Sequence, residues 1–479
     1  MVVWGIHHTP VFTGRFPVAL HQSQPGRRDD VFDLYARDLS EQPLPKFRMP
    51  ENSSLPDTVY NLIHDELLLD GNSRQNLATF CTTYVPPQAQ QLMQDCVDKN
   101  MIDQDEYPQT AEIEHRCVHI LADLWNAPDA KTTLGCSTTG SSEAAMLGGL
   151  ALKWKWRKRQ EAAGKPADKP NLICGPVQIC WHKFARYFDV ELRELPILDG
   201  ELCMTAAQVA EAVDENTIGV VPTLGVTFTG VYEPVEEISK ELDRIEAERG
   251  LDIPIHVDAA SGGFIAPFLH EDVVWDFRLP RVKSINASGH KYGLSPLGVG
   301  WAIWREPEDL PEELIFNVDY LGGQVPTFAL NFSRPAGEIV AQYYQFLRLG
   351  RKGYTEVQGA CADTAQYLAA ELEKIGHFDM LYNGDGGLPA VCYSLKNSAD
   401  RGYTLYDVSE RLRMRGWQIA SYPLPANRHD LIVQRVMVRH GIGRDLMELL
   451  IEDMSRTIEF LDRNPMRNRE AKASFHHGR

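Results

Sequence analysis

A lysine and an aspartate in the middle of the chain are the residues whose types and spacing point most directly to chemistry. Asp258 stands in the segment HVDAA at residues 256–260, and Lys291 stands in the segment SGHKYG at residues 288–293. A lysine amine can form a Schiff base with an aldehyde, and a carboxylate can keep a pyridinium nitrogen protonated so that the ring accepts electrons. The pair therefore indicates pyridoxal phosphate as the cofactor.

Both residues follow segments that we expect to be buried strands. Residues 253–257 and 282–286 are short and largely apolar. Ligands of open α/β sheets bind outside the carboxyl ends of such strands. A lysine on its own is usually a solvated surface charge, so the interpretation depends on the pair and on this setting.

A third segment has the composition of a phosphate site. Residues 140–143, GSSE, begin a stretch with apolar residues at helical spacing, and Ser141 or Ser142 is expected to cap its first turn. The free N–H groups and the positive dipole end of a helix N-terminus can also hold a phosphate. Simple N-capping is the alternative, but beside Asp258 and Lys291 the phosphate interpretation is favoured.

The overall composition limits the classes of partner. The 479 residues carry a net charge of -18, which disfavours nucleic acid and anionic membranes because both are negatively charged. We find no apolar run of transmembrane length and no signal-peptide core, so we expect a cytoplasmic protein. The nine cysteines are scattered without a Cys-x-x-Cys pair, and the histidine pairs at 7–8 and 476–477 lack partner ligands. We therefore expect neither a disulfide framework nor a metal site.

The pattern of apolar segments predicts an α/β fold with two domains. We expect an N-terminal arm at 1–57, a helical segment and a large domain with a mainly parallel sheet at 58–350, a smaller C-terminal α+β domain at 351–464, and a tail at 465–479. Short strands that alternate with helices in the large domain are typical of βαβ units. The expected helices cover residues 59–69, 89–100, 110–125, 339–349 and 357–374, and the expected strands cover residues 172–174, 190–195, 218–221, 253–257, 282–286, 299–304, 390–394, 417–420 and 432–438.

Four longer segments carry a more specific resemblance. They are LDGNSRQNLATF at 69–80, KPNLICGPVQICWHKFAR at 169–186, VVWDFRLPR at 273–281 and NFSRPA at 331–336. Together with the lysine, the aspartate and the serine pair, these segments resemble the glutamate decarboxylases, which are fold type I pyridoxal phosphate enzymes related in architecture to aspartate aminotransferase. The resemblance covers roughly residues 58–477. It implies decarboxylation of L-glutamate to 4-aminobutyrate and carbon dioxide, with one proton consumed in each turnover.

The resemblance also implies which residues bind the cofactor. Lys291 would hold the aldehyde and Asp258 the ring nitrogen. The ring would lie between Ala260 and Gln178, with Thr227 near its hydroxyl. The residues implied at the phosphate are Ser141, Ser142, Ser288 and His290. His182 is a weaker candidate, for which the alternative is a core histidine.

For the substrate, the resemblance places Arg435 at the α-carboxylate, where a planar guanidinium can form paired hydrogen bonds. A structural ion pair is the alternative for this arginine, with Arg439 close in sequence. Thr79 and the backbone of Phe80 would receive the distal carboxylate. The residues implied to act across a subunit interface are Asn100, Asp103 and Ser333. A homodimer follows from this arrangement, and the family often assembles dimers into hexamers.

The C-terminal residues 474–479, SFHHGR, resemble family tails that plug the active site at neutral pH. His477 would then attack the cofactor aldehyde, which suits a side chain that loses its charge near neutrality. A disordered tail is the alternative. Calmodulin control is not expected, because the basic end after Arg463 offers few apolar anchors besides Phe475.

Three other functions share part of this pattern. A cysteine desulfurase would use a reactive thiol, for which Cys361 is the candidate, although it lies in a helix-like stretch. Another amino-acid decarboxylase would differ mainly at Thr79, Phe80 and Gln178. A non-catalytic partner protein on the same fold is disfavoured by the presence of the lysine, the aspartate and both serines.

Overall fold

The computed structural model describes residues 47–318 and 325–464, so the expected arm up to residue 46 and His477 lie outside the described residues. The chain divides into two compact units, residues 1–71 and 72–479. The described part of the first unit contains one α-helix, α2 (Pro56–Leu67), which starts with a proline. A proline suits this position because the first N–H of a helix has no intrahelical acceptor. All the elements described below belong to the second unit.

A seven-stranded sheet forms the centre of the larger part of this unit, with the strand order β1-β7-β6-β5-β4-β2-β3. Strands β3, β2, β4, β5 and β6 are parallel, and β7 pairs antiparallel with both β6 and β1. The strands are β1 (Gly135–Thr138), β2 (Asn171–Cys174), β3 (Glu191–Glu194), β4 (Thr217–Val221), β5 (Ile255–Asp258), β6 (Val282–Ala287) and β7 (Gly300–Trp304).

The prediction of a mainly parallel sheet is thus confirmed, with one correction. The segment 299–304 was expected to continue the βαβ series, but β7 runs antiparallel to β6. A loop carrying Lys291 joins these two strands in place of a crossover helix. Such a connection reverses the chain direction, which is why the neighbouring strand is antiparallel.

Helices cover both faces of the sheet, so every residue of β2, β4, β5 and β7 is buried. Neighbouring residues of a strand point to opposite faces. In β2, Ile173 packs in one core with helices α4 and α8, whereas Leu172 and Cys174 pack in the other core with α5 and α6. The helices of this part are α3 (Pro87–Gln94), α4 (Pro108–Leu124), α5 (Ser141–Ala162), α6 (Ile179–Tyr187), α7 (Ala206–Ala212), α8 (Val235–Arg249) and α9 (Ala266–Leu269).

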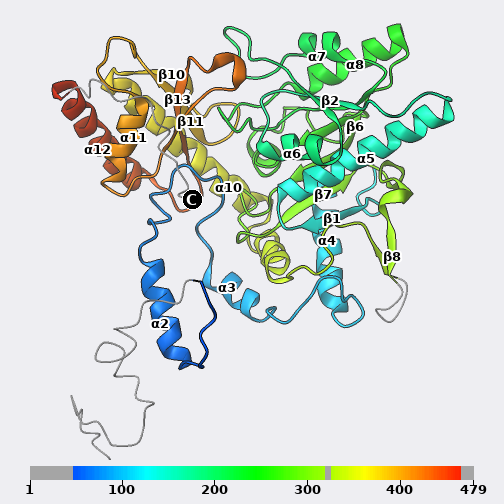
Figure 1. Ribbon diagram of the computed structural model, residues 1–479, viewed down its shortest axis with the longest axis horizontal. Coiled ribbons are helices and arrows are strands. Elements are labelled where there is room, and N and C mark those ends of the chain that lie inside the picture. The colour runs from blue at the N-terminus through cyan, green and yellow to red at the C-terminus, as the bar shows by residue number, and fades with distance from the viewer. Residues whose placement is uncertain (1–46, 319–324, 465–479) are drawn as a thin grey trace, which may run out of the picture. The chain divides into compact units, whose positions relative to one another are not determined.

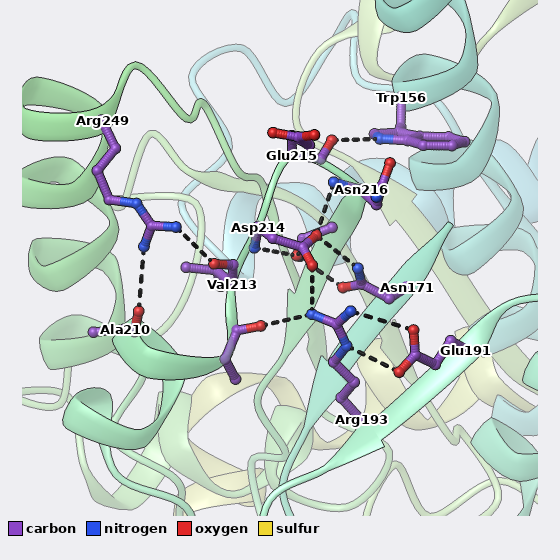
Figure 2. Close-up of polar contacts among 12 residues, drawn as sticks. Trp156, Asn171, Glu191, Arg193, Ala210, Val213, Asp214, Glu215, Asn216 and Arg249 are labelled. Carbon is purple, nitrogen blue, oxygen red and sulfur yellow. Dashed lines mark hydrogen bonds and ion pairs between the residues drawn. The ribbon is translucent and has the colours of Figure 1, made fainter. Parts of the chain in front are cut away.

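A polar cluster ties together the amino ends of the parallel strands (Figure 2). The carboxylate of Asp214, in the turn before β4, accepts hydrogen bonds from Asn171 Nδ2 of β2 and Arg193 Nη1 of β3, both at 2.8 Å. The indole of Trp156 on α5 donates to the carbonyl of Glu215 in the same turn, at 3.1 Å. These contacts hold the strand ends in register at the edge opposite to the carboxyl ends.

A smaller four-stranded antiparallel sheet follows in the sequence, with the order β10-β11-β13-β12. Its elements are β10 (Phe378–Tyr382), β11 (Ala390–Leu395), α11 (Leu405–Arg413), β12 (Ala420–Pro423), β13 (Ile432–Met437) and α12 (Arg444–Arg463). Figure 1 shows α11 and α12 beside this sheet, with the long α10 (Gly337–Ile375) extending from it toward the larger sheet. A two-stranded pair is formed by β8 (Phe316–Val318) and β9 (Val325–Thr327).

The two helices expected at 339–349 and 357–374 form the two parts of α10. They meet at Gly350, whose φ of 57° and ψ of -175° are not helical. Only glycine adopts this conformation readily, so it marks the break between them. Strand β12 begins three residues later than the segment expected at 417–420, and β1, β8, β9 and β10 were not predicted. None of the described helices is long and apolar enough to span a membrane.

Candidate active site

A cavity of about 420 Å³ lies at the carboxyl ends of β4, β5 and β6. This is within the roughly 300–1,000 Å³ common for small-molecule sites. Residues from distant parts of the chain meet there because parallel strands end at the same edge of the sheet. The expected site residues that line the cavity are Thr79, Phe80, Ser141, Ser142, Gln178, Thr227, Asp258, Ala260, His290 and Lys291. Lining residues that were not predicted include Cys81, Thr139, Cys180, Thr223 and Ser261.

The carboxylate of Asp258 is held by three donors and is almost completely buried. Its Oδ2 accepts a hydrogen bond from the indole of Trp181 at 2.7 Å. Its Oδ1 accepts hydrogen bonds from Asn286 Nδ2 at 3.0 Å and from the backbone N–H of Ala260 at 3.1 Å. A carboxylate fixed in this way has a defined orientation toward the cavity, as a partner for a cationic ring nitrogen requires.

A second layer of polar side chains supports this carboxylate. His256 Nε2 donates to Asn286 Oδ1, and Ser284 Oγ donates to His256 Nδ1, each at 2.7 Å. Burial lowers the pKa of His256 to about 4, so its ring is neutral. The strand register sets His256 opposite Ser284 and Asp258 opposite Asn286. Sequence reasoning missed these supporting residues, although the alternation of polar residues in the two strands was a signal for them.

Lys291 lies on the loop after β6, with its Nζ 3.4 Å from Ser261 Oγ and 5.1 Å from the centroid of the Phe80 ring. Burial lowers the pKa of Lys291, and the nearby Arg435 guanidinium acts in the same direction, while the Asp258 carboxylate opposes them. A lysine with a lowered pKa spends more time as the neutral amine, which is the nucleophilic form.

The start of α5 corrects one expectation. The helix begins at Ser141 with Gly140 as its N-cap, and no side chain caps it, so neither Ser141 nor Ser142 is the capping residue. Glu143 instead accepts hydrogen bonds from the backbone N–H and the hydroxyl of Thr139, at 2.8 and 2.9 Å. The first N–H groups of the helix and both serine hydroxyls are therefore available to an anion in the cavity.

His290 packs directly against this helix start. A Cβ atom added to Gly140 would lie 3.0 Å from His290 Cε1, so the glycine allows the close approach. His290 Nδ1 accepts the backbone N–H of Val299 at 3.2 Å, which leaves the proton on Nε2. Burial and the neighbouring Lys291 lower the pKa of His290 to about 4, so it is a neutral donor.

Arg435 lies beside the cavity rather than in its lining. Its guanidinium is buried, stacks over the Phe80 ring with Cζ 4.2 Å from the centroid, and donates to the carbonyls of Ala78, at 2.9 Å, and Thr227. Arg435 forms no ion pair with any carboxylate in residues 47–318 and 325–464, so the alternative of a structural ion pair within these residues is wrong. A guanidinium with this charge uncompensated suits an anionic ligand.

The structure does not bring the other expected residues into the cavity of the single chain. Asn100 Nδ2 donates to Ser333 Oγ at 3.2 Å, and Asp103 lies in the turn that follows Asn100. Ser288 is fully buried behind the cavity, and its hydroxyl has no partner among the described residues. His182 is exposed and 3.3 Å from Glu194, so it is not a core histidine.

The cysteines give no support to a desulfurase. Cys361 is buried within α10, and burial raises its pKa to about 12. A buried, protonated thiol in a helix lacks the access and the thiolate character that such an enzyme requires. All nine cysteines lie within the described ranges and are free thiols.

Comparisons with known proteins agree with this site. Residues 50–396 match the pyridoxal-dependent decarboxylase conserved domain. The glutamate decarboxylase of Aliivibrio fischeri is 60% identical over 462 residues, covering 96% of this chain and 100% of that protein. The glutamate decarboxylase of Solanum lycopersicum is 48% identical over 436 residues, covering 90% and 86%. This chain belongs to the glutamate decarboxylase family.

Solved structures lead to the same family and fold. The glutamate decarboxylase of Lactobacillus brevis matches with a TM-score of 0.87 and 46% identity, over 90% of this chain and 98% of that one. The sphingosine-1-phosphate lyase of Burkholderia pseudomallei, at 21% identity and a TM-score of 0.73, covers 88% and 94% and shares the fold. The predicted α/β fold of the type I pyridoxal phosphate enzymes is therefore confirmed. Pyridoxal phosphate is the cofactor of this glutamate decarboxylase family member.

Proposed function

We propose that the protein removes the α-carboxyl group of L-glutamate, giving 4-aminobutyrate and carbon dioxide and consuming one proton. The observation that carries this proposal is a single cavity that combines an amine of lowered pKa, a fixed carboxylate and an uncapped helix N-terminus. Relatives at 46–60% identity over most of the chain carry the name of this activity, which supports the choice of substrate.

The residues of the cavity fit pyridoxal phosphate. Asp258 would pair with the ring nitrogen, and Gln178 and Ala260 would contact the two faces of the ring. Thr223 lines the cavity, and its hydroxyl, like that of Ser288 beside the cavity wall, is buried without a partner among the described residues, so both hydroxyls lack a partner that a bound ligand would supply. The phosphate would be held by Ser141, Ser142 and His290, which line the cavity, with the N-terminus of α5, and the buried Ser288 would support them from behind the cavity wall. When bound, the cofactor supplies an aldehyde for Lys291 and a ring that accepts electrons from a departing carboxylate.

The side chains of the protein would orient glutamate by its two acidic groups. Arg435, buried and without an ion pair in the described parts of the chain, would bind the α-carboxylate and hold the bond to be broken in one orientation. Thr79 and the backbone of Phe80 would bind the distal carboxylate, and Thr227 would lie close to the ring. Lys291, whose pKa is lowered by burial, would be the base or acid nearest to the reacting carbon.

The functional assembly is proposed to be a homodimer that associates further into a hexamer. Asn100 donates to Ser333 Oγ and accepts the N–H of Arg334 outside the cavity, and with Asp103 and Ser333 it would serve a neighbouring subunit's site. Exposed apolar side chains at Leu297 and Phe316 support a protein interface on this unit. The cytoplasm is the expected location, and calmodulin is not an expected partner.

We also retain the proposed domain limits at 57, 350 and 464 and the proposed gating by His477. The backbone break at Gly350 supports the second limit.

In the proposed gating by His477, the C-terminal tail would compete for the cofactor aldehyde as the pH rises and the histidine loses its charge.

The decisive experiment is to incubate the purified protein and pyridoxal phosphate with glutamate, aspartate, tyrosine and cysteine from about pH 4 to pH 7, a range set by titratable groups of the site. Carbon dioxide and amine products are then measured. We expect 4-aminobutyrate from glutamate and little product from the others. Absence of 4-aminobutyrate would falsify the proposed function, and a different preferred amino acid would point to another decarboxylase.

A further inference from the structure

Arg439, just after the end of β13, is a buried guanidinium without a counterion. Its side chain is only 2% exposed, and no carboxylate in residues 47–318 or 325–464 forms an ion pair with it. Burial lowers its pKa, but an arginine remains charged under these conditions. An uncompensated buried charge disfavours folding unless its hydrogen bonds are made, and the buried Nε of Arg439 has no partner among the described residues.

All the hydrogen bonds of Arg439 go to acceptors within residues 73–83. Its Nη1 donates to the carbonyls of Asn76 and Thr79, both at 2.9 Å. Its Nη2 makes longer contacts with the carbonyl of Ser73, at 3.5 Å, and with Thr83 Oγ1, at 3.4 Å. The guanidinium thus holds the segment that contributes Thr79 to the cavity wall.

Four consecutive carbonyls of this segment, residues 76–79, accept hydrogen bonds from residues 435–439. Besides the two bonds of Arg439, the backbone N–H of Met437 donates to the carbonyl of Leu77 and Arg435 Nη2 donates to that of Ala78, both at 2.9 Å. The orientation of each peptide plane in the segment is therefore set from the side of β13.

This orientation has a consequence for the peptide bond between Thr79 and Phe80. A trans peptide is planar, with its C=O and N–H pointing in opposite directions. Because Arg439 holds the Thr79 carbonyl, the Phe80 N–H points away from Arg439, and it donates to no described residue. Thr79 Oγ1 accepts the N–H of Cys81 at 3.2 Å, so the hydroxyl proton can be donated elsewhere. Both residues line the cavity that contains Lys291.

We propose that Arg439 is a positioning residue that makes the site selective for a second, distal carboxylate. It directs the Phe80 N–H and the Thr79 hydroxyl as a pair of donors, and its charge polarises the peptide so that the N–H becomes a stronger donor. Arg435 belongs to the reacting end of the ligand, whereas Arg439 acts on the other end without touching it. The proposal rests on the proposed function for the identity of the diacid.

The test uses the full chain loaded with pyridoxal phosphate and the variants Arg439→Met and Arg439→Lys. Binding of glutarate, with two carboxylates, and of pentanoate, with one, is measured from the change in cofactor absorbance, together with kcat and KM for glutamate. We expect Arg439→Met to lose about 10-fold or more of the preference for glutarate and to raise KM more than it lowers kcat, since hydrogen bonds to charged groups have this magnitude. Arg439→Lys should lose part of the preference for glutarate, because the three N–H donors of lysine sit on one nitrogen atom and cannot reach all the acceptors of the guanidinium.

Arg281→Lys is the matched control. Arg281 is also buried but pairs with Asp243, Glu246 and Asp252 near the amino end of β6, and its replacement should leave the glutarate preference unchanged. The inference is overturned if the folded Arg439→Met variant keeps the preference for glutarate over pentanoate within about 2-fold of the wild type, a change smaller than that expected from one lost hydrogen bond. If the methionine variant does not fold, the same criterion applies to Arg439→Lys. If the wild type makes no 4-aminobutyrate, the proposed function fails, while the ratio of the two acids still tests Arg439.

Discussion

Trp181→Phe is the substitution that most directly tests whether the fixed orientation of Asp258 is used to hold the cofactor. Phenylalanine keeps the aromatic packing against Phe184 and His256 but removes the indole N–H, which donates to Asp258 Oδ2 at 2.7 Å. A hydrogen bond to a buried charged group contributes about 1.5–3 kcal/mol. Since 1.4 kcal/mol is a factor of ten in a binding constant, the affinity for pyridoxal phosphate should fall about 10- to 100-fold.

The assay is a titration of the cofactor-free protein with pyridoxal phosphate, followed by absorbance. Trp156→Phe is the control, because Trp156 is also buried and also loses one indole hydrogen bond, to the carbonyl of Glu215 at the opposite edge of the sheet (Figure 2). It should lower the thermal midpoint without changing cofactor affinity. If both variants bind the cofactor as tightly as the wild type, the Trp181 bond does not position Asp258 and the reasoning is refuted.

Three further predictions follow from the site and its surroundings. Lys291→Ala should abolish both the absorbance band of the lysine-bound cofactor and the release of carbon dioxide, whereas an active variant would exclude Lys291 as the cofactor lysine. Burial raises the pKa of Glu233 from 4.5 to about 8, so the folded protein holds this proton more tightly than the unfolded chain. The resulting contribution to the free energy of unfolding is fully present below about pH 4.5 and is lost as the pH rises through about 8. Thermal melts should therefore show Glu233→Gln gaining stability relative to the wild type over that window, and parallel curves would contradict the shift. Truncation after Ala473 should extend glutamate decarboxylation toward neutral pH, and an unchanged pH profile would refute gating by His477.

Much of the site could be predicted from local sequence because its chemistry depends on residues at strand and helix ends. Asp258 and Lys291 follow strands with a clear apolar pattern, and parallel strands bring such ends to one edge. The helix that begins at Ser141 was recognisable from its spacing of apolar residues. The break at Gly350 was also visible, as a gap between two helical patterns.

Other features were not predictable because weak local patterns were overridden by pairing between distant segments. Strand β1 pairs with β7, which is far from it in sequence, and β10 was hidden by its partly exposed residues. The antiparallel direction of β7 depends on the loop that returns the chain beside β6. The N-cap of α5 is Gly140 rather than a serine because Glu143 and the approach of His290 organise that turn.

The sequence by itself determined the cofactor chemistry and the fold class, since these depend on residue type and on periodicity along the chain, while the resemblance of longer segments to the glutamate decarboxylases implied most of the other residues that line the cavity. Only the tertiary structure decided how those residues are held. The donors of Asp258 come from α6 and β6, and the carbonyls before Phe80 are held by arginines from the far end of the chain, Arg435 and Arg439. The Asp258 bonds span 28 and 77 positions and the two arginine bonds span 357 and 360 positions, so a pattern of neighbours in the sequence carries no information about them.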